Sequence, residues 1–64
     1  MLTLRQREIL RLLVDGFTTK EIGLKLHISA RTVEAHKYRM VESIGVKSNA
    51  ELIHFAIKHG VIGP

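Results

Sequence analysis

Three glycines, each followed directly by a large apolar residue, divide the sequence: Gly16-Phe17, Gly45-Val46 and Gly60-Val61. A left-handed glycine just past a helix, followed by an apolar residue that packs back on the last turn, is the Schellman ending of a helix. The pattern predicts helix ends near residues 15, 44 and 59. The apolar contacts that it predicts are Phe17 with Leu12, Val46 with Val41, and Val61 with Ala56.

Start signals precede each of these segments. The side-chain oxygens of Thr3, Thr18, Ser29 and Ser48 can cap a helix by accepting from a free backbone N–H group. In three cases a Glu or Gln follows three residues later, which fits the capping box: Thr3-Gln6, Thr18-Glu21 and Ser48-Glu51. No strand pattern is present. The sequence therefore predicts an all-α domain, 1–64, of four helices at about 4–15, 19–26, 30–44 and 49–59.

The boundary between the second and third helices has no glycine. It reads Leu26-His27-Ile28-Ser29, and we expect His27 to adopt a positive φ, where His is enriched. Gly23 lies inside the second helix, where glycine costs about 1 kcal/mol relative to alanine. Close approach of the following helix would offset that cost. A short helix, a tight turn and a close crossing predict a helix-turn-helix.

The composition restricts the possible partners. Ten Lys and Arg against six Asp and Glu give a net charge of +4 and a pI near 10.0, which favours an anionic partner. The absence of cysteine excludes disulfides and thiolate metal sites. No apolar run approaches the roughly 18 residues that span a membrane, and no signal peptide is visible. We expect a cytoplasmic domain with no membrane partner.

Catalysis and metal binding find little support in the residue pattern. No nucleophile has a base and an orienting group nearby, and a small helical domain offers little pocket volume. His54 and His59 are separated by about 140° around a helix, so they do not share a face as metal ligands must. We expect no enzyme activity, cofactor, metal or small-molecule ligand.

The third helix has one apolar face and one polar face. Val33, Met40 and Ile44 form the inward stripe, with His36 and Val41 beside it. In a helix-turn-helix the second helix enters the major groove of DNA, and its N-terminal residues touch base edges. The predicted base-contacting residues are Arg31, Glu34, Ala35 and Tyr38.

Glu34 has two interpretations. Its carboxylate could accept a hydrogen bond from a cytosine amino group, or it could orient Arg31 or Tyr38 by helical pairing. Phosphate contacts hold the protein on DNA without specifying the sequence. The predicted phosphate-contacting residues are Lys20, Thr32, Lys37, Arg39, Lys47 and Ser48. Ser48 also has a purely structural interpretation as a helix cap.

The fourth helix carries more apolar surface than its own core needs. Leu52, Phe55 and Ala56 can serve that core. A second stripe consists of Ala50, Ile53 and Ile57. An exposed apolar stripe is typical of an interface, and a two-fold dimer is the commonest way to cover one. The alternative is that neighbouring helices cover the stripe.

The residues from Leu2 to Ile62 resemble the LuxR-type helix-turn-helix domain found at the C-terminus of NarL/FixJ-type bacterial response regulators of two-component systems. The resemblance rests on Leu2-Thr3-x-Arg5-x-x-Glu8-Ile9-Leu10, Lys20-Glu21-Ile22, Leu26-x-Ile28-Ser29, Thr32-Val33-x-x-His36, Gly45-Val46-x-Ser48 and Ala50-Glu51-Leu52. It implies sequence-specific binding to double-stranded DNA, usually as a homodimer on inverted repeats, to regulate transcription. It also implies that residues 30–44 form the recognition helix, that the fourth helix mediates dimerisation, and that His36 is structural.

The chain departs from the family pattern at several positions. Ser43 and Asn49 stand where the family often has lysine and arginine, which removes two phosphate contacts. Thr19 stands where asparagine is common, Gly23 replaces alanine, and a lysine is frequent at the Glu34 position. These departures bear on affinity and site preference rather than on the fold.

Two alternatives follow from the same resemblance. Helix-turn-helix domains also dock RNA polymerase or sigma-type partners, so an interaction module without independent DNA binding is the competing interpretation. Domains of this kind usually follow a receiver or sensory domain, so the chain is either a stand-alone regulator or the C-terminal part of a longer one.

Overall fold

The computed structural model describes residues 2–60, and within this range it contains four helices and no strand. The helices are α1 (Leu4–Val14), α2 (Thr19–Leu26), α3 (Ala30–Ile44) and α4 (Asn49–Lys58). The predicted all-α class is therefore confirmed. α1 and α4 each end one residue earlier than expected, because Asp15 and His59 are the cap residues that precede the left-handed Gly16 and Gly60.

All four predicted N-caps are confirmed. The side-chain oxygens of Thr3, Thr18, Ser29 and Ser48 accept from the backbone N–H three residues on, at 3.0–3.1 Å. The capping boxes at Thr3 and Thr18 are complete. The box predicted at Ser48 is wrong. Glu51 Oε1 instead accepts from the backbone N–H of Lys47 at 2.7 Å, since the φ of Ser48 is −150° whereas that of Thr18 is −75°.

The predicted helix ends differ in their hydrogen bonding. After α1, the Phe17 N–H donates to Leu12 O at 3.1 Å and the Gly16 N–H to Leu13 O at 3.0 Å, which is the expected Schellman pair. At the end of α3, the left-handed Gly45 donates to Val41 O at 2.9 Å, the simpler single-bond ending. The contact predicted between Val61 and Ala56 lies outside the described residues.

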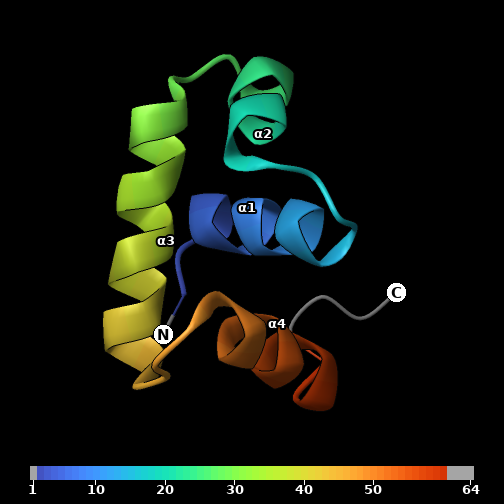
Figure 1. Cartoon of the computed structure of the whole chain (residues 1–64), viewed down its shortest axis with the longest axis vertical. Coiled ribbons are helices and arrows are strands. Elements are labelled where there is room, and N and C mark those ends of the chain that lie inside the picture. The colour runs from blue at the N-terminus through green and yellow to red at the C-terminus, as the bar shows by residue number, and fades with distance from the viewer. Residues whose placement is uncertain (1, 61–64) are drawn as a thin grey trace.

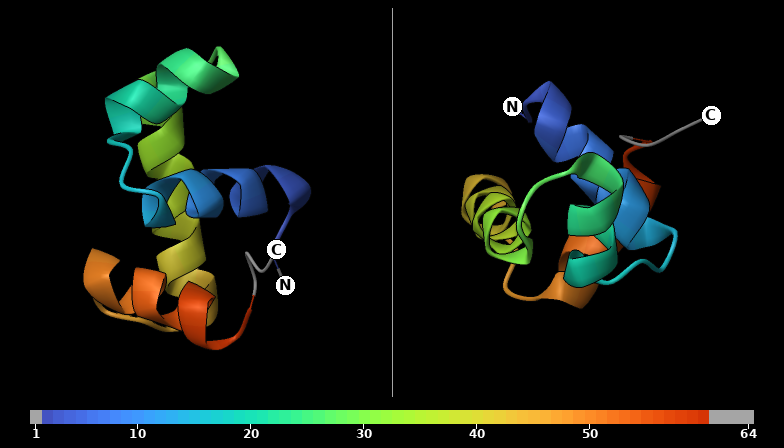
Figure 2. Two further views of the ribbon diagram at one scale, coloured as in Figure 1. Left: turned by 90° about the vertical axis from the view of Figure 1, so that its right-hand side faces the viewer. Right: turned by 90° about the horizontal axis from the view of Figure 1, so that it is seen from above.

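α3 forms one side of the molecule, and α1, α2 and α4 all lie on the same side of α3 (Figures 1 and 2). α1 lies between α2 and α4 (Figure 1). Side chains from all four helices meet in one core. The buried members are Ile9, Leu10, Leu13, Ile22, Val33, Met40, Leu52 and Ala56. Because every neighbour of α3 packs on the same side, its far side stays uncovered.

Gly23 allows α2 to pack directly against the turn that leads into α3. A Cβ at this position would lie 2.7 Å from Ile28 O and 3.2 Å from the backbone N of Ala30. His27 has the predicted positive φ, 60°, and the Ile28 N–H donates to Gly23 O at 3.0 Å. The close approach involves the turn and the first residue of α3 rather than the body of a helix. α2 and α3 therefore form a helix-turn-helix.

Gly23→Ala should destabilise the fold. Alanine favours a helix by about 1 kcal/mol over glycine, but a Cβ 2.7 Å from a backbone oxygen forces α2 and the turn apart. Overpacking costs typically about 1–3 kcal/mol, and a backbone neighbour cannot rotate away. Because the backbone cannot give way easily, we expect a net loss near the upper end of the difference, about 2 kcal/mol in the free energy of unfolding, measured by urea denaturation.

Leu24→Ala is the matched control for this measurement. Leu24 is the next residue of α2 and is 72% exposed, so its truncation should change the free energy of unfolding by less than about 0.5 kcal/mol. A Gly23→Ala variant as stable as the parent chain would contradict the close packing of α2 on the turn.

Candidate nucleic-acid interface

The uncovered face of α3 carries the residues predicted to reach DNA bases. Arg31, Glu34 and Tyr38 are exposed, Tyr38 by 64%, and Ala35 is partly exposed. On the core side, Val33 and Met40 are fully buried, and Ile44, Val41 and His36 are partly buried. The division of α3 into an inward and an outward face follows the sequence prediction.

His36 belongs to the inward side of α3. Its Nδ1 is buried and has no hydrogen-bond partner among the described residues. This nitrogen cannot contact a phosphate without a rearrangement of the core edge. The position of His36 agrees with the structural role that the family resemblance implies.

A hollow lies between the middle of α3 and the N-terminus of α4. Its lining residues are Glu34, Lys37, Tyr38, Val41, Lys47, Ser48 and Asn49. It brings two predicted base-contacting residues together with three predicted phosphate-contacting residues, and these residues come from two different helix segments, up to 14 positions apart in the sequence. We call this set the α3–α4 hollow.

The remaining predicted phosphate-contacting residues lie outside the α3–α4 hollow. Lys20 is exposed in the first turn of α2, and Arg39 is exposed on α3. Thr32 is exposed in the first turn of α3, and its hydroxyl is 2.9 Å from Ser29 Oγ. One of these two hydroxyls donates to the other, so only one O–H group remains to donate to a phosphate, while both oxygens can still accept.

Glu34 pairs with Lys37 and not with Arg31 or Tyr38. Glu34 Oε1 lies 3.3 Å from Lys37 Nζ, one helical turn away. Hydrogen bonding with Thr19, together with hydrogen bonding and the positive charge of Lys37, holds the pKa of Glu34 below its ordinary value. The predicted pairing of Glu34 with Arg31 or Tyr38 is therefore wrong, because its ion pair is with Lys37.

Ser48 has a demonstrated structural role. Its Oγ accepts from the Glu51 N–H at 3.1 Å and so caps α4. A hydroxyl that accepts one hydrogen bond still has its proton to donate. Capping therefore leaves Ser48 free to donate to a phosphate, and Lys47 is exposed beside it in the α3–α4 hollow.

The second apolar stripe on α4 is partly uncovered. Ile57 is 62% exposed and Ala50 is exposed, while Ile53 is partly buried. The alternative that neighbouring helices cover the stripe is wrong for Ala50 and Ile57 in this chain, and holds in part for Ile53. An apolar edge therefore remains on α4, as an interface would require.

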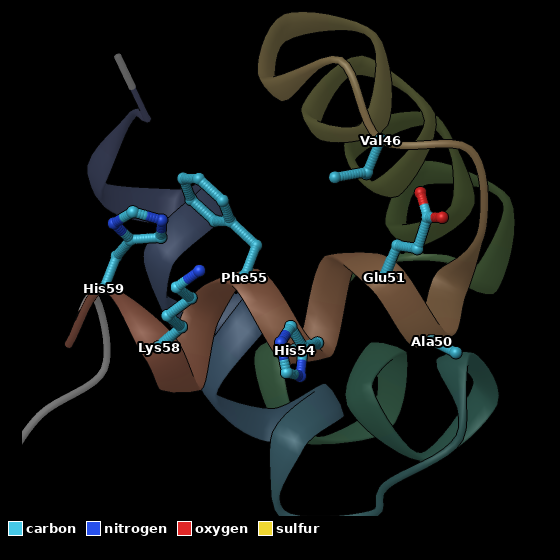
Figure 3. Close-up of a pocket in the computed structure, with 7 residues that line it drawn as sticks. All are labelled: Val46, Ala50, Glu51, His54, Phe55, Lys58 and His59. Atoms are coloured by element: carbon cyan, nitrogen blue, oxygen red, sulfur yellow. The ribbon is translucent and has the colours of Figure 1, made fainter.

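A separate groove lies between α4 and the segment that precedes it, with Val46 on that segment and the other lining residues on α4 or at its end (Figure 3). Val46, Ala50, Glu51, His54, Phe55, Lys58 and His59 line it. The rings of Phe55 and His59 have centroids 4.4 Å apart and are tilted by 36° relative to each other. Within residues 2–60, no group of three or more His, Cys, Asp or Glu side chains is placed to hold a metal ion. None of the four helices is long and apolar enough to cross a membrane.

A helix-turn-helix whose second helix presents an uncovered polar face is the architecture of a DNA-binding domain. Residues 1–56 match the model of the family described as bacterial regulatory proteins, luxR family. This chain belongs to that family, and it is a DNA-binding domain of transcription regulation.

Known relatives share both sequence and fold with the chain. It is 45% identical over 58 residues to the oxygen regulatory protein NreC of Staphylococcus aureus, and the match covers 91% of the chain and 27% of NreC. The structure of the transcription factor GerE superposes with a TM-score of 0.89 at 37% identity, covering 94% of this chain and 90% of GerE. The response regulator ChrA, from a haem-sensing two-component system, gives a TM-score of 0.88 at 30% identity, covering 95% of this chain and 30% of ChrA.

Ser48→Asp should separate the capping role of Ser48 from a contact with phosphate. Aspartate caps a helix about as well as serine, so the thermal midpoint should change little. The added negative charge at the α3–α4 hollow should weaken binding to duplex DNA at low salt several-fold by repelling phosphate. Thermal denaturation and fluorescence anisotropy measure the two effects. Unchanged affinity in the folded variant would remove Ser48 from the interface.

Proposed function

We propose that this domain binds double-stranded DNA sequence-specifically by inserting α3 into the major groove, in order to regulate transcription. The observation that carries the proposal is the uncovered outer face of α3, bordered by the cationic α3–α4 hollow. An α-helix with its side chains is about 10–12 Å wide, which suits a major groove of about 12 Å.

The residues nearest the bases would be those in the first half of α3. Arg31 can donate two hydrogen bonds to a guanine, and Tyr38 extends from the exposed surface one turn after Glu34. Ala35 is small, so it lets the helix approach closely and can touch a thymine methyl group. Glu34 adds an acceptor among these groups.

The phosphate-contacting groups would flank this helix on both sides. Lys20 lies at the start of α2, and Lys47 and Ser48 lie at the start of α4. Lys37 and Arg39 extend from α3 itself, with Thr32 at its start. Support comes from their placement, since cations at both edges of an inserted helix can hold it on the two phosphate backbones.

The chain would act as the output part of a longer bacterial regulator. It spans about a quarter of the length of NreC, 27%, and 30% of the response regulator ChrA. We propose that residues 1–64 form the DNA-binding domain of such a regulator. The domain would act in the cytoplasm, and a signal received by another part of the protein would control it. The alternative is a stand-alone regulator. GerE supports it, because the match covers 90% of the GerE chain.

Dimerisation through α4 is part of the proposal. The stripe formed by Ala50, Ile53 and Ile57 leaves apolar surface exposed at the edge of α4. A two-fold contact between two such stripes would bury it and would place two recognition helices on paired half-sites. α4 and α2 lie at opposite ends of the molecule (Figure 1), so the contact would leave the helix-turn-helix free.

A protein partner is the second candidate function, and the groove on α4 favours it. Val46 and Phe55 give the groove an apolar floor, and Lys58 and His59 give it a basic border (Figure 3). RNA polymerase or a sigma-type protein is the kind of partner proposed. A gel-retardation assay on mixed duplex DNA at low salt separates the two functions, because a module that binds only protein should not retard DNA.

Lys20→Ala and Tyr38→Ala should affect binding in different ways. Loss of a phosphate contact should weaken binding to all sequences alike and make the plot of log affinity against log salt shallower by about 1. With four Lys and Arg contacts, the parent slope should be about −3 to −4 per domain. Tyr38→Ala should instead relax base preference. Identical relative preferences of both variants across a site library would contradict this division of roles.

Ile57→Glu should weaken the dimer. Burying an unpaired carboxylate at the contact is unfavourable, so dimers should dissociate in sedimentation velocity and affinity for paired half-sites should fall more than for one half-site. Leu24→Glu is the control for sedimentation, because Leu24 is 72% exposed on α2, at the other end of the molecule from α4. Unchanged sedimentation and unchanged two-site affinity of Ile57→Glu would rule out this interface.

A further inference from the structure

A carboxylate occupies the face of α3 that would meet a polyanion. The Glu34 side chain is 53% exposed and lines the α3–α4 hollow beside Tyr38 and Lys37. DNA carries one negative charge per about 1.7 Å of helix axis. A negative group at this place therefore weakens binding to DNA in general, unless it gains a specific hydrogen bond in return.

Lys37 pairs with this carboxylate. Lys37 Nζ lies 3.3 Å from Glu34 Oε1, one helical turn away. Hydrogen bonding with Thr19, together with hydrogen bonding and the positive charge of Lys37, holds the pKa of Glu34 below its ordinary value. At neutral pH the group is therefore a pure acceptor, and its pairing leaves some of its about four lone-pair sites free.

A pure acceptor in the major groove can bond only to a donor on a base edge. The donors there are the N4 amino group of cytosine and the N6 amino group of adenine. Adenine presents its N7 acceptor next to N6, and N7 would repel the second carboxylate oxygen. The edge of cytosine next to N4 is a C–H group, which does not repel it. Cytosine is therefore the better partner.

We propose that Glu34 makes this domain select a C·G base pair at one position of each half-site. The proposal rests on the proposed insertion of α3 into the major groove. A lysine at the same position would donate to guanine instead. Glutamate at this position thus selects cytosine where lysine would select guanine, and its negative charge lowers the affinity for all other sequences.

The test is selection of binding sites from a random duplex library, run in parallel with the full chain and with Glu34→Gln. The parent pool should be enriched in cytosine at one position per half-site, by roughly 5- to 150-fold over other bases. Glutamine has nearly the same shape but pairs with adenine N6 and N7. The Glu34→Gln pool should therefore change from cytosine to adenine at that position only, and its affinity for unrelated DNA should rise.

Glu8→Gln is the matched control. Glu8 is an exposed glutamate of α1 that pairs with Arg5 at 3.5 Å over one helical turn, so the substitution removes the same charge from the same kind of ion pair on another helix. Its selected sites should equal those of the parent. A Glu34→Gln pool with the parent base at every position would overturn the inference while leaving the proposed function intact. A parent pool with no enriched motif would overturn both.

Discussion

The packing of α2 against the turn before α3 is the contact on which the rest of the structure depends. The Gly23 backbone approaches Ile28 O so closely that a Cβ would lie 2.7 Å from it. This contact sets the position of α3 relative to α2, and α1 and α4 then pack on the same side of α3 (Figure 1). The opposite side of α3 has no neighbouring helix, and the polar side chains of α3 lie on this uncovered face.

Ion pairs neutralise part of the positive charge on the surface of the domain. The net charge of +4 favours DNA as a partner, yet part of it is taken up inside the domain. Lys37 is tied to Glu34 and Arg5 to Glu8. Such exposed pairs contribute only about 0–1 kcal/mol to stability. The Lys37–Glu34 pair bears on recognition instead, because it places a hydrogen-bond donor and an acceptor next to each other on the surface of α3.

The fold could be read from the sequence because each helix carries its own boundary signals. Thr3, Thr18, Ser29 and Ser48 cap the four helices as expected, and His27 takes the left-handed conformation that the missing glycine implied. These are local effects of one or two residues. The Glu51 bond to the Lys47 N–H was not foreseen, because it depends on the extended φ of Ser48, which residue types do not determine.

The site was predictable only in part, for the same reason. Helical periodicity placed Arg31, Glu34 and Tyr38 on the outer face of α3, and the structure has them there. Periodicity within one helix cannot show that Lys47 and Ser48 line the same hollow as Glu34. Those neighbours depend on how α3 and α4 pack, so they required the three-dimensional arrangement.

The central claim is that the outer face of α3 is the surface that contacts DNA. NMR titration of the isotope-labelled chain with a duplex containing its selected site tests this claim most directly. The account predicts that backbone amide shifts change most along the outer face of α3, at the start of α2 and around Lys47 and Ser48. Changes confined to the α4 groove around Phe55 and Lys58, with α3 unaffected, would contradict it.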